Sequence, residues 1–336
     1  MAIADPMDIS SPNAGQYVEL GADGALRLDS GTELRRFGVA YQTYGTLNAE
    51  KSNAVLVCHA LTGDQHAANA HPLTGKPGWW DIMIGPGRPL DTNRYFIIST
   101  NVLGGCMGST GPKEINPDTG EVWGLSFPVI TIGDMVRAQA RLLDHLGIER
   151  AAILGTSRGG LIAMVIAATA KDRLTGVALN DIGPELMAEG LADIDAYLGR
   201  RPKAQTFEEA AAMRASLMPG FEGVPHSRWA EEVRIHYTNT ADGLNINYDP
   251  ALRDAVAAAA MQPAPDLWPL FAALDGLPLA LIRGKNSNLL STETAKKMRT
   301  LRPDLIYADV PGRGHVPFLD EPEALAVLHE WRTHLP

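Results

Sequence analysis

RAAILGTSRGGLIAMVIAATA, residues 150–170, is the stretch that decides the fold. A short apolar run (150–155), typical of a buried strand, leads directly into Gly155-Thr-Ser157-Arg-Gly159, and a longer apolar run (161–170) with the length of a helix follows. Flanking glycines let a strand and a helix approach closely while the serine between them occupies a tight, strained turn. The stretch therefore predicts an exposed nucleophilic Ser157. An ordinary glycine-rich turn is the alternative, but it would not require a buried strand before the serine and a helix after it.

Strand-like and helical segments alternate on both sides of this stretch. The predicted strands are AVLVCHA (54–60), YFIIST (95–100), LTGVALND (174–181), LPLALIRG (277–284) and LIYADVPG (305–312). The clearest predicted helices are IGDMVRAQARLLDHLG (132–147) and PEALAVLHEWRTHL (322–335). Such alternation predicts the α/β class with a doubly wound, mostly parallel sheet. Two earlier strand-like runs within residues 17–47 suit an antiparallel edge.

Residues 182–265 interrupt this alternation. They are mostly amphipathic and helical, and the clearest pieces are FEEAAAMRASLM and ALRDAVAAAAM. We therefore predict a helical cap inserted into the sheet domain. The chain then divides into a first part of the core (1–181, with residues 1–15 disordered), the cap (182–265) and a second part of the core (266–336).

Composition narrows the class of function. The 336 residues carry a net charge of −10, which disfavours binding to nucleic acid or to anionic membranes. Two cysteines cannot form a disulfide framework, no run of about 18 apolar residues predicts a membrane span, and the first residues do not resemble a signal peptide. We expect a cytoplasmic enzyme for small molecules.

No cofactor or metal ion is expected. The glycine-rich segment 104–108 lacks the ending of a phosphate-binding loop, so we do not assign it to phosphate. His59, His66 and His71 have no carboxylate or cysteine pattern beside them, and a loop of polar surface residues explains them better than a metal site.

The other catalytic groups follow from position in the chain. His315 lies in PGRGHVPF directly after a predicted strand, near the C-terminus, and is the predicted general base. The predicted oxyanion hole combines the backbone N–H of Arg158, next to the nucleophile, with that of Leu61, in the loop after strand 54–60.

The acid that orients His315 is the ambiguous member. It is expected after strand 277–284, but that segment continues as GKNSNLL and places Asn288 at the position of the acid. An amide cannot stabilise an imidazolium. Asp181, at the end of the strand that follows the nucleophile helix, is the alternative acid, although a turn residue at the entry of the cap would look the same.

With these groups the chain resembles the α/β-hydrolase superfamily, in two pieces. Residues 17–150 resemble homoserine O-acetyltransferase in CHALTGDQHAA, GWWDIMIGPGRPLDTNRYFIISTNVLGGCMGSTGP and FPVITIGDMVRAQARLLDHLGIER. From the serine onward, ILGTSRGGLIAM, VALNDIGPEL, DLWPLFAAL, LIRGKNSNLLS and VPGRGHVPFLDEPEAL resemble a bacterial α/β-fold ester hydrolase. The N-terminal part of the chain thus resembles an acetyltransferase and the C-terminal part a hydrolase, with the junction near residue 150.

The resemblance implies acyl transfer through Ser157 but leaves the acceptor open. The acetyltransferases usually read GGSMGG where this chain has GTSRGG, and have Asp where it has Val316. Their lid arginine has no evident counterpart, and of the groups expected to bind homoserine only Thr62 remains. We therefore predict hydrolysis of small carboxylic esters, a carboxylesterase activity.

Two other functions stay open. The first is transfer from acetyl-CoA to homoserine, a step of methionine biosynthesis. The second is a weakly active scaffold or binding protein, because Asn288 occupies the expected position of the acid. The expected partners are a small ester or acyl substrate, or acetyl-CoA and homoserine, without nucleic acid or membrane, and a homodimer is left open.

Overall fold

A computed structural model describes residues 15–72 and 75–336, so the predicted disorder of residues 1–15 falls almost entirely outside the described residues. The chain forms two compact units: one comprises the residues up to Val177 together with Leu335–Pro336, and the other is Ala178–His334. The division falls inside strand β10 (Leu174–Asn180) rather than at a border of the predicted cap. The division into core, cap and core stays a prediction.

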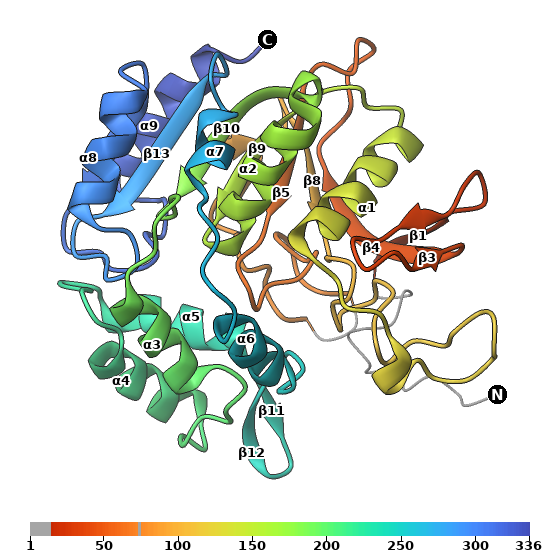
Figure 1. Ribbon diagram of the computed structural model, residues 1–336. Helices are drawn as coiled ribbons and strands as arrows, with labels where there is room; N and C mark the ends of the chain where they lie inside the picture. Colours follow the sequence, from red (N-terminus) through yellow and green to blue (C-terminus); the bar gives the residue numbers. More distant parts are fainter. Residues whose placement is uncertain (1–14, 73–74) are drawn as a thin grey trace. The chain divides into compact units, whose positions relative to one another are not determined.

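The first unit opens with short strands and then alternates strands with helices (Figure 1). Its elements before β10 are β1 (Gln16–Leu20), β2 (Leu26–Arg27), β3 (Glu33–Leu34), β4 (Phe37–Tyr44), β5 (Ala54–Cys58), β6 (Ile84–Gly85), β7 (Leu90–Asp91), β8 (Phe96–Thr100), η2 (Gly124–Ser126), α1 (Ile132–His145), β9 (Ala151–Thr156), α2 (Arg158–Ala170) and η3 (Lys171–Arg173).

The sheet of this unit has the strand order β1-β4-β8-β5-β9-β10. Strands β1 and β4 pair antiparallel, as do β4 and β8, and this is the predicted antiparallel edge. Strand β5 pairs parallel with both β8 and β9. Every residue of β5 and β9 is buried, as their continuous apolar sequences predict. The predicted α/β class is confirmed.

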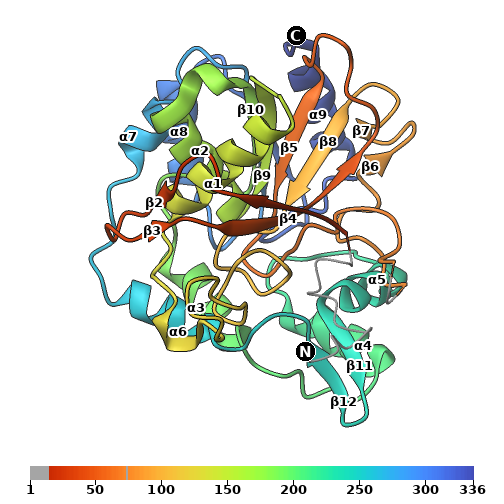
Figure 2. The ribbon, with the colours of Figure 1, turned by 90° about the vertical axis from the view of Figure 1, so that its right-hand side faces the viewer.

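Helix α2 packs on β5 and β9, and α1 packs on α2 (Figure 2). The predicted helix after the serine began at residue 161, but α2 begins at Arg158, three residues earlier. That expectation was wrong because two glycines, which disfavour helix, occupy positions 159 and 160. Tertiary packing overrides this preference, since a side chain at Gly159 would collide with the backbone of β5.

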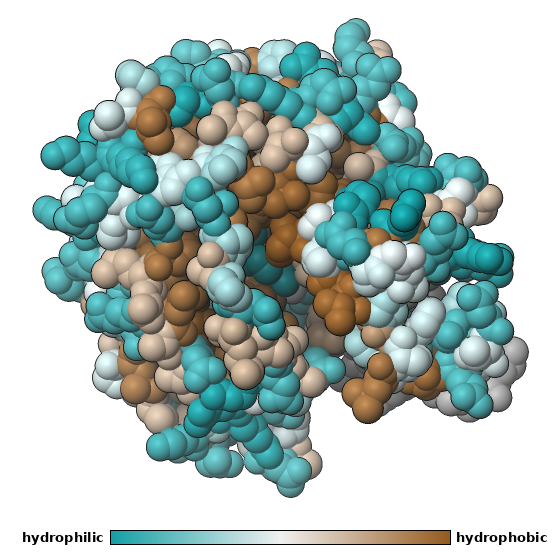
Figure 3. Space-filling model, viewed as in Figure 1, coloured by the Kyte–Doolittle hydropathy of each residue, from teal (hydrophilic) through white to brown (hydrophobic). Residues whose placement is uncertain are grey.

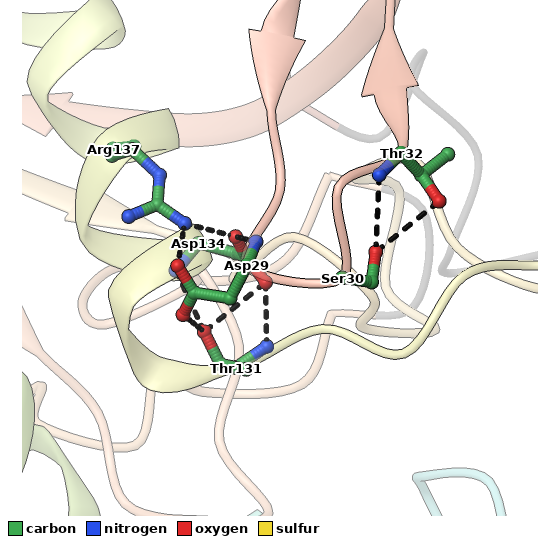
Figure 4. Close-up of polar contacts among 6 residues, drawn as sticks. All are labelled: Asp29, Ser30, Thr32, Thr131, Asp134 and Arg137. Atoms are coloured by element: carbon green, nitrogen blue, oxygen red, sulfur yellow. Dashed lines mark hydrogen bonds and ion pairs between the residues drawn. The ribbon is translucent and has the colours of Figure 1, made fainter.

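The start of α1 is fixed by a polar cluster drawn in Figure 4. Thr131 accepts a hydrogen bond from Asp134 N–H and donates its own N–H to the Asp134 carboxylate, which closes a capping box. Arg137 binds the carboxylates of both Asp134 and Asp29. These contacts tie α1 to the loop after β2, and α1 in turn supports α2 and the serine turn.

The second unit continues from the end of β10. Its further elements are α3 (Ala188–Tyr197), α4 (Phe207–Leu217), α5 (His226–His236), β11 (Tyr237–Thr240), β12 (Gly243–Ile246), α6 (Leu252–Ala260), α7 (Trp268–Ala272), β13 (Leu279–Gly284), α8 (Thr292–Leu301), β14 (Ile306–Val310) and α9 (Pro322–Thr333). The mostly helical character of residues 182–265 agrees with the prediction. The β11–β12 hairpin and helix α8 were not predicted.

Two apolar clusters hold this unit. Strands β13 and β14 pair parallel beside β10, and α9 packs on both, with Trp331 fully buried. Helices α4 and α5 pack on each other around Trp229, Val233 and Ala211. Hydrophilic side chains cover much of the face shown in Figure 3. Among the described residues, no helix is long and apolar enough to span a membrane.

Candidate active site

Ser157 occupies a strained turn between β9 and α2. Its backbone angles, φ 51° and ψ −123°, lie where residues with a side chain are rarely found. Strain of this kind costs about 1–3 kcal/mol and persists mainly where the surrounding structure enforces it, often at functional sites. The residue is partly exposed, whereas Thr156 before it is buried. The geometry is that of a nucleophile elbow.

The two glycines of the motif are required by close backbone contacts. A Cβ atom at Gly155 would lie 2.5 Å from Gly159 O, and one at Gly159 would lie 2.0 Å from Cys58 O. Neither position can hold another residue without moving β5 or α2. Packing therefore explains the Gly-x-Ser-x-Gly spacing directly.

The segment after β5 lies against the elbow, where the oxyanion hole was predicted. The Arg158 guanidinium places Nη2 3.5 Å from Ala60 O and 3.4 Å from His59 Nδ1. Leu61 follows these two residues and is partly exposed, like Arg158. The segments that carry the two predicted N–H donors are thus neighbours, although their role in binding an oxyanion stays a proposal.

Burial dominates the electrostatics beneath the elbow. It raises the pKa of the Cys58 thiol to about 12 and lowers that of the Arg158 guanidinium to about 10. Burial, and then the Arg158 charge, lower the pKa of His59 to about 3. At neutral pH this places a neutral thiol, a neutral imidazole and a charged guanidinium beside Ser157.

The three histidines expected in a loop of surface residues are buried, with 2% of His59, 7% of His66 and 6% of His71 exposed, so that expectation was wrong. The Trp79 ring stands edge-on to His59, with 6.4 Å between centroids, and its Nε1–H donates to Asp64 O. Thr62 lies in the turn that follows Leu61 and is partly exposed. In the described part of the chain, no group of three or more His, Cys, Asp or Glu residues is arranged to hold a metal ion.

The acid and base candidates meet within the second unit. His315 Nδ1 lies 2.7 Å from Asp181 Oδ2. Because a carboxylate accepts, Nδ1 donates its proton in this contact, and the lone pair of a neutral imidazole then resides on Nε2. This is the tautomer that a general base for a serine requires. Asp181 and His315 are 134 residues apart in sequence, and the fold brings them together.

Asp181 is held by a set of short hydrogen bonds. Its side chain is fully buried, its Oδ1 accepts from Gly284 N at 2.8 Å, and its Oδ2 also accepts from Ser287 Oγ at 2.7 Å. The backbone at Asp181 has a positive φ of 53°. A buried carboxylate needs such partners, because leaving it unpaired would cost several kcal/mol. Ser287 escaped the sequence analysis, since no spacing rule links it to Asp181.

Asn288, at the position expected of the acid, points elsewhere. Its Nδ2 donates to Asp193 Oδ2 on α3 at 2.5 Å. The neighbouring Asn286 donates to Gly220 O and to Glu222 in the segment after α4. The loop after β13 therefore binds the helical segment, while Asp181 contacts the base candidate.

The loop that carries His315 is braced from several sides. Asn180 Nδ2 donates to Pro317 O, and Phe318 packs against Phe221 and Trp229 with ring centroids 5.4 and 6.1 Å apart. Arg313 and Glu321 form a mostly buried ion pair at 2.6 Å. These contacts limit the movement of the imidazole.

Comparison with known proteins places this arrangement in a family. Residues 53–322 match the family described as alpha/beta hydrolase fold. An α/β hydrolase from Novosphingobium aromaticivorans is 26% identical, with a TM-score of 0.67 over 95% of this chain and 99% of the other.

The more similar sequences are acetyltransferases. Homoserine O-acetyltransferase of Rhodospirillum rubrum is 60% identical over 169 residues, which cover 50% of this chain and 43% of that protein. The Caulobacter vibrioides enzyme of the same name is 51% identical over 268 residues, covering 74% of this chain and 67% of the other. Against most of these curated relatives the match spans about half of their length.

These relatives overturn one prediction. Hydrolysis of carboxylic esters was preferred because groups for homoserine were missing after residue 150, and that preference is wrong. Proteins named homoserine O-acetyltransferase are 51–60% identical to this chain over the residues that match. A match to 74% of the chain also extends past residue 150, so the similarity does not end at the predicted junction.

Proposed function

This chain belongs to the α/β-hydrolase-fold family, and from that premise we propose that it transfers an acetyl group from acetyl-CoA to the hydroxyl of homoserine through an acyl enzyme on Ser157. The observation that carries the chemistry is the strained backbone of Ser157 at the start of α2. The identity of 51–60% to homoserine O-acetyltransferases supports the choice of acceptor.

The first half-reaction acylates the enzyme. Ser157 Oγ attacks the thioester carbonyl while His315 Nε2 accepts the hydroxyl proton. The C–S bond breaks, and the same proton passes from His315 to the leaving thiolate, which departs as free CoA. The backbone N–H groups of Arg158 and Leu61 stabilise the negative charge on the carbonyl oxygen.

The second half-reaction uses the same groups in reverse. His315 accepts the proton of the homoserine hydroxyl, whose oxygen attacks the acetyl-Ser157 carbonyl. The bond to Ser157 Oγ breaks, the proton moves from His315 to Ser157, and O-acetylhomoserine leaves. Thr62, in the turn after Leu61, is the residue to which we assign contact with the substrate.

Asp181 serves as the acid of this triad. Its hydrogen bond to His315 Nδ1 fixes the tautomer and stabilises the imidazolium that forms in both half-reactions. The alternative of a weakly active scaffold rested on the missing carboxylate at position 288. A buried carboxylate 2.7 Å from the imidazole removes that reason.

The test measures release of free CoA from acetyl-CoA with and without homoserine, and identifies O-acetylhomoserine by mass spectrometry. We expect saturable release at least about tenfold above the rate with water alone, a difference of more than 1 kcal/mol in transition-state stabilisation. The Ser157→Ala variant is the control and should release no CoA above background. Release that is independent of homoserine would refute the proposed acceptor.

A further inference from the structure

The Arg158 guanidinium is a cation with few partners among residues 15–72 and 75–177 of its unit. Its Nε is buried and has no hydrogen-bond partner among residues 15–72 and 75–177. Its contacts are Nη2 to Ala60 O at 3.5 Å and to His59 Nδ1 at 3.4 Å, both long for hydrogen bonds. No carboxylate among the described residues of this unit pairs with it. Because a guanidinium has five N–H donors, most of its binding capacity is unused.

His59 adds a second buried group with unused capacity. It is 2% exposed, and its Nδ1 lies 2.6 Å from Ala60 O. A carbonyl can only accept, so Nδ1 carries the proton and cannot also accept from Arg158. The lone pair therefore lies on Nε2, which is buried without a partner among the described residues of this unit.

These two groups have complementary requirements. The guanidinium calls for an anion, ideally a planar carboxylate that accepts two N–H bonds. The unprotonated Nε2 of His59 can accept a hydrogen bond from an N–H donor. An α-amino acid carries both, a carboxylate and an ammonium group on one carbon, whereas a thioester with a second carboxylate would supply only the anion.

We propose that Arg158 binds the carboxylate of the amino-acid acceptor and that His59 Nε2 accepts a hydrogen bond from its ammonium group. The inference rests on the proposed function, because it names the residues that hold homoserine. Arg158 directly follows the nucleophile Ser157 in the chain, so we expect an acceptor held by its side chain to lie close to the acyl enzyme. Specificity for homoserine thus begins at the elbow itself.

The experiment compares calorimetric binding of homoserine, homoserine amide and 4-hydroxybutyrate to the full chain. Homoserine amide lacks the carboxylate, and 4-hydroxybutyrate lacks the ammonium group. The wild type should bind homoserine about 10- to 100-fold more tightly than the amide, as expected for hydrogen bonds to a charged group. Arg158→Met should remove this preference, and Arg158→Lys should retain part of it. His59→Phe should remove the preference for homoserine over 4-hydroxybutyrate.

Arg214 supplies the matched control. It lies on α4, and its Nε is also buried without a partner among the described residues of its unit. Arg214→Met should leave the preference for homoserine over its amide unchanged. If Arg214→Met abolishes the preference and Arg158→Met does not, the inference is wrong. It is equally wrong if the wild type binds homoserine and the amide alike.

Turnover separates this inference from the proposed function. Tight, Arg158-dependent binding of homoserine without transfer of acetyl would reject the function and keep the binding site. If Arg158→Met lowers kcat equally for both acceptors and leaves their KM ratio intact, Arg158 acts on the oxyanion instead, and the inference fails. If Arg158→Met weakens binding of succinyl-CoA relative to acetyl-CoA and spares homoserine, the carboxylate belongs to the donor, which also overturns it.

Discussion

The elbow and the acid–base pair are built in opposite ways. The elbow uses residues 155–159 and the neighbouring segment after β5, and its geometry follows from close contacts among glycines and backbone. The pair joins Asp181 to His315 across 134 residues and depends on Ser287 from a third segment. A motif made by local chain geometry can be read from the sequence, whereas a partner supplied by topology is left among alternatives, as Asp181 and Asn288 were. Each prediction below tests one side of this contrast.

The largest effect is expected at the elbow. Ser157→Ala should lower kcat for CoA release by a factor of about 10⁵ to 10⁶, as loss of a serine nucleophile does elsewhere. The same variant should lose covalent labelling by a fluorophosphonate, followed by peptide mass spectrometry. Ser216→Ala, on the exposed side of α4, is the control and should keep both. Labelling that survives in Ser157→Ala would move the nucleophile elsewhere.

The second prediction concerns the acid. Asp181→Asn should lower kcat by about 10³- to 10⁴-fold, because the amide favours the wrong tautomer of His315. Asn288→Asp should change kcat by less than about threefold, under 1 kcal/mol, because position 288 contacts Asp193 rather than the base. A gain of about 100-fold in Asn288→Asp would reverse the assignment and restore the position expected from the sequence.

The third prediction concerns the pH dependence of stability and the buried His59, which lies next to Arg158. Burial lowers the folded pKa of His59 to about 3, below its ordinary value of 6.5. Between these values the unfolded chain binds a proton that the folded chain does not, so stability is present above pH 6.5 and is lost as the pH falls. Between about pH 7 and 5 this single group should remove about 2 kcal/mol of stability.

Chemical denaturation at several pH values checks this. The His59→Gln variant should lose less stability than the wild type over the same interval, and His145→Gln, at an exposed position on α1, should match the wild type. Equal slopes for the wild type and His59→Gln would mean that His59 is protonated in the folded chain, contrary to its burial.

The smallest effect is expected at Ser287. Removing its hydroxyl takes one charge-assisted hydrogen bond from Asp181 and should lower kcat about tenfold without changing KM. Ser287→Thr should restore most of the rate. Ser291→Ala removes the N-cap of α8 and should cost about 1 kcal/mol of stability while leaving kcat unchanged. A Ser287→Ala enzyme with the normal rate would limit Ser287 to a structural role.

The sequence predicts the fold well where the pattern is local. The strands around the elbow and helix α1 follow from apolar runs and helical spacing, and the structure has them within a few residues. The β11–β12 hairpin was missed because it lies inside a segment of helical composition, although residues 244–248, LNINY, alternate apolar and polar side chains. The start of α2 was misplaced because a close contact with Cys58, invisible in the sequence, overrides the low helix propensity of glycine.

The candidate site divides in the same way. Ser157 and His315 could be proposed from motif and chain order, whereas only the fold shows that Asp181, and not Asn288, contacts His315. The acceptor was predicted wrongly because absence of a familiar motif was taken as absence of a binding group. Under the binding proposed above, Arg158 illustrates the weakness of that reasoning, since it lay in the quoted stretch and was considered only for its backbone.

The loop after β13 has one further consequence, which concerns how such an enzyme evolves. Asn286 and Asn288 bind the helical segment, while Ser287 between them holds Asp181. Neighbouring residues of this loop are therefore expected to be under different selection, two for contact with the helical segment and one for contact with Asp181. We expect positions 286 and 288 to vary together with residues 182–265, and position 287 to be retained wherever Asp181 is the acid. A lineage could then exchange the helices of residues 182–265 and keep the hydrogen bonds that join Ser287, Asp181 and His315.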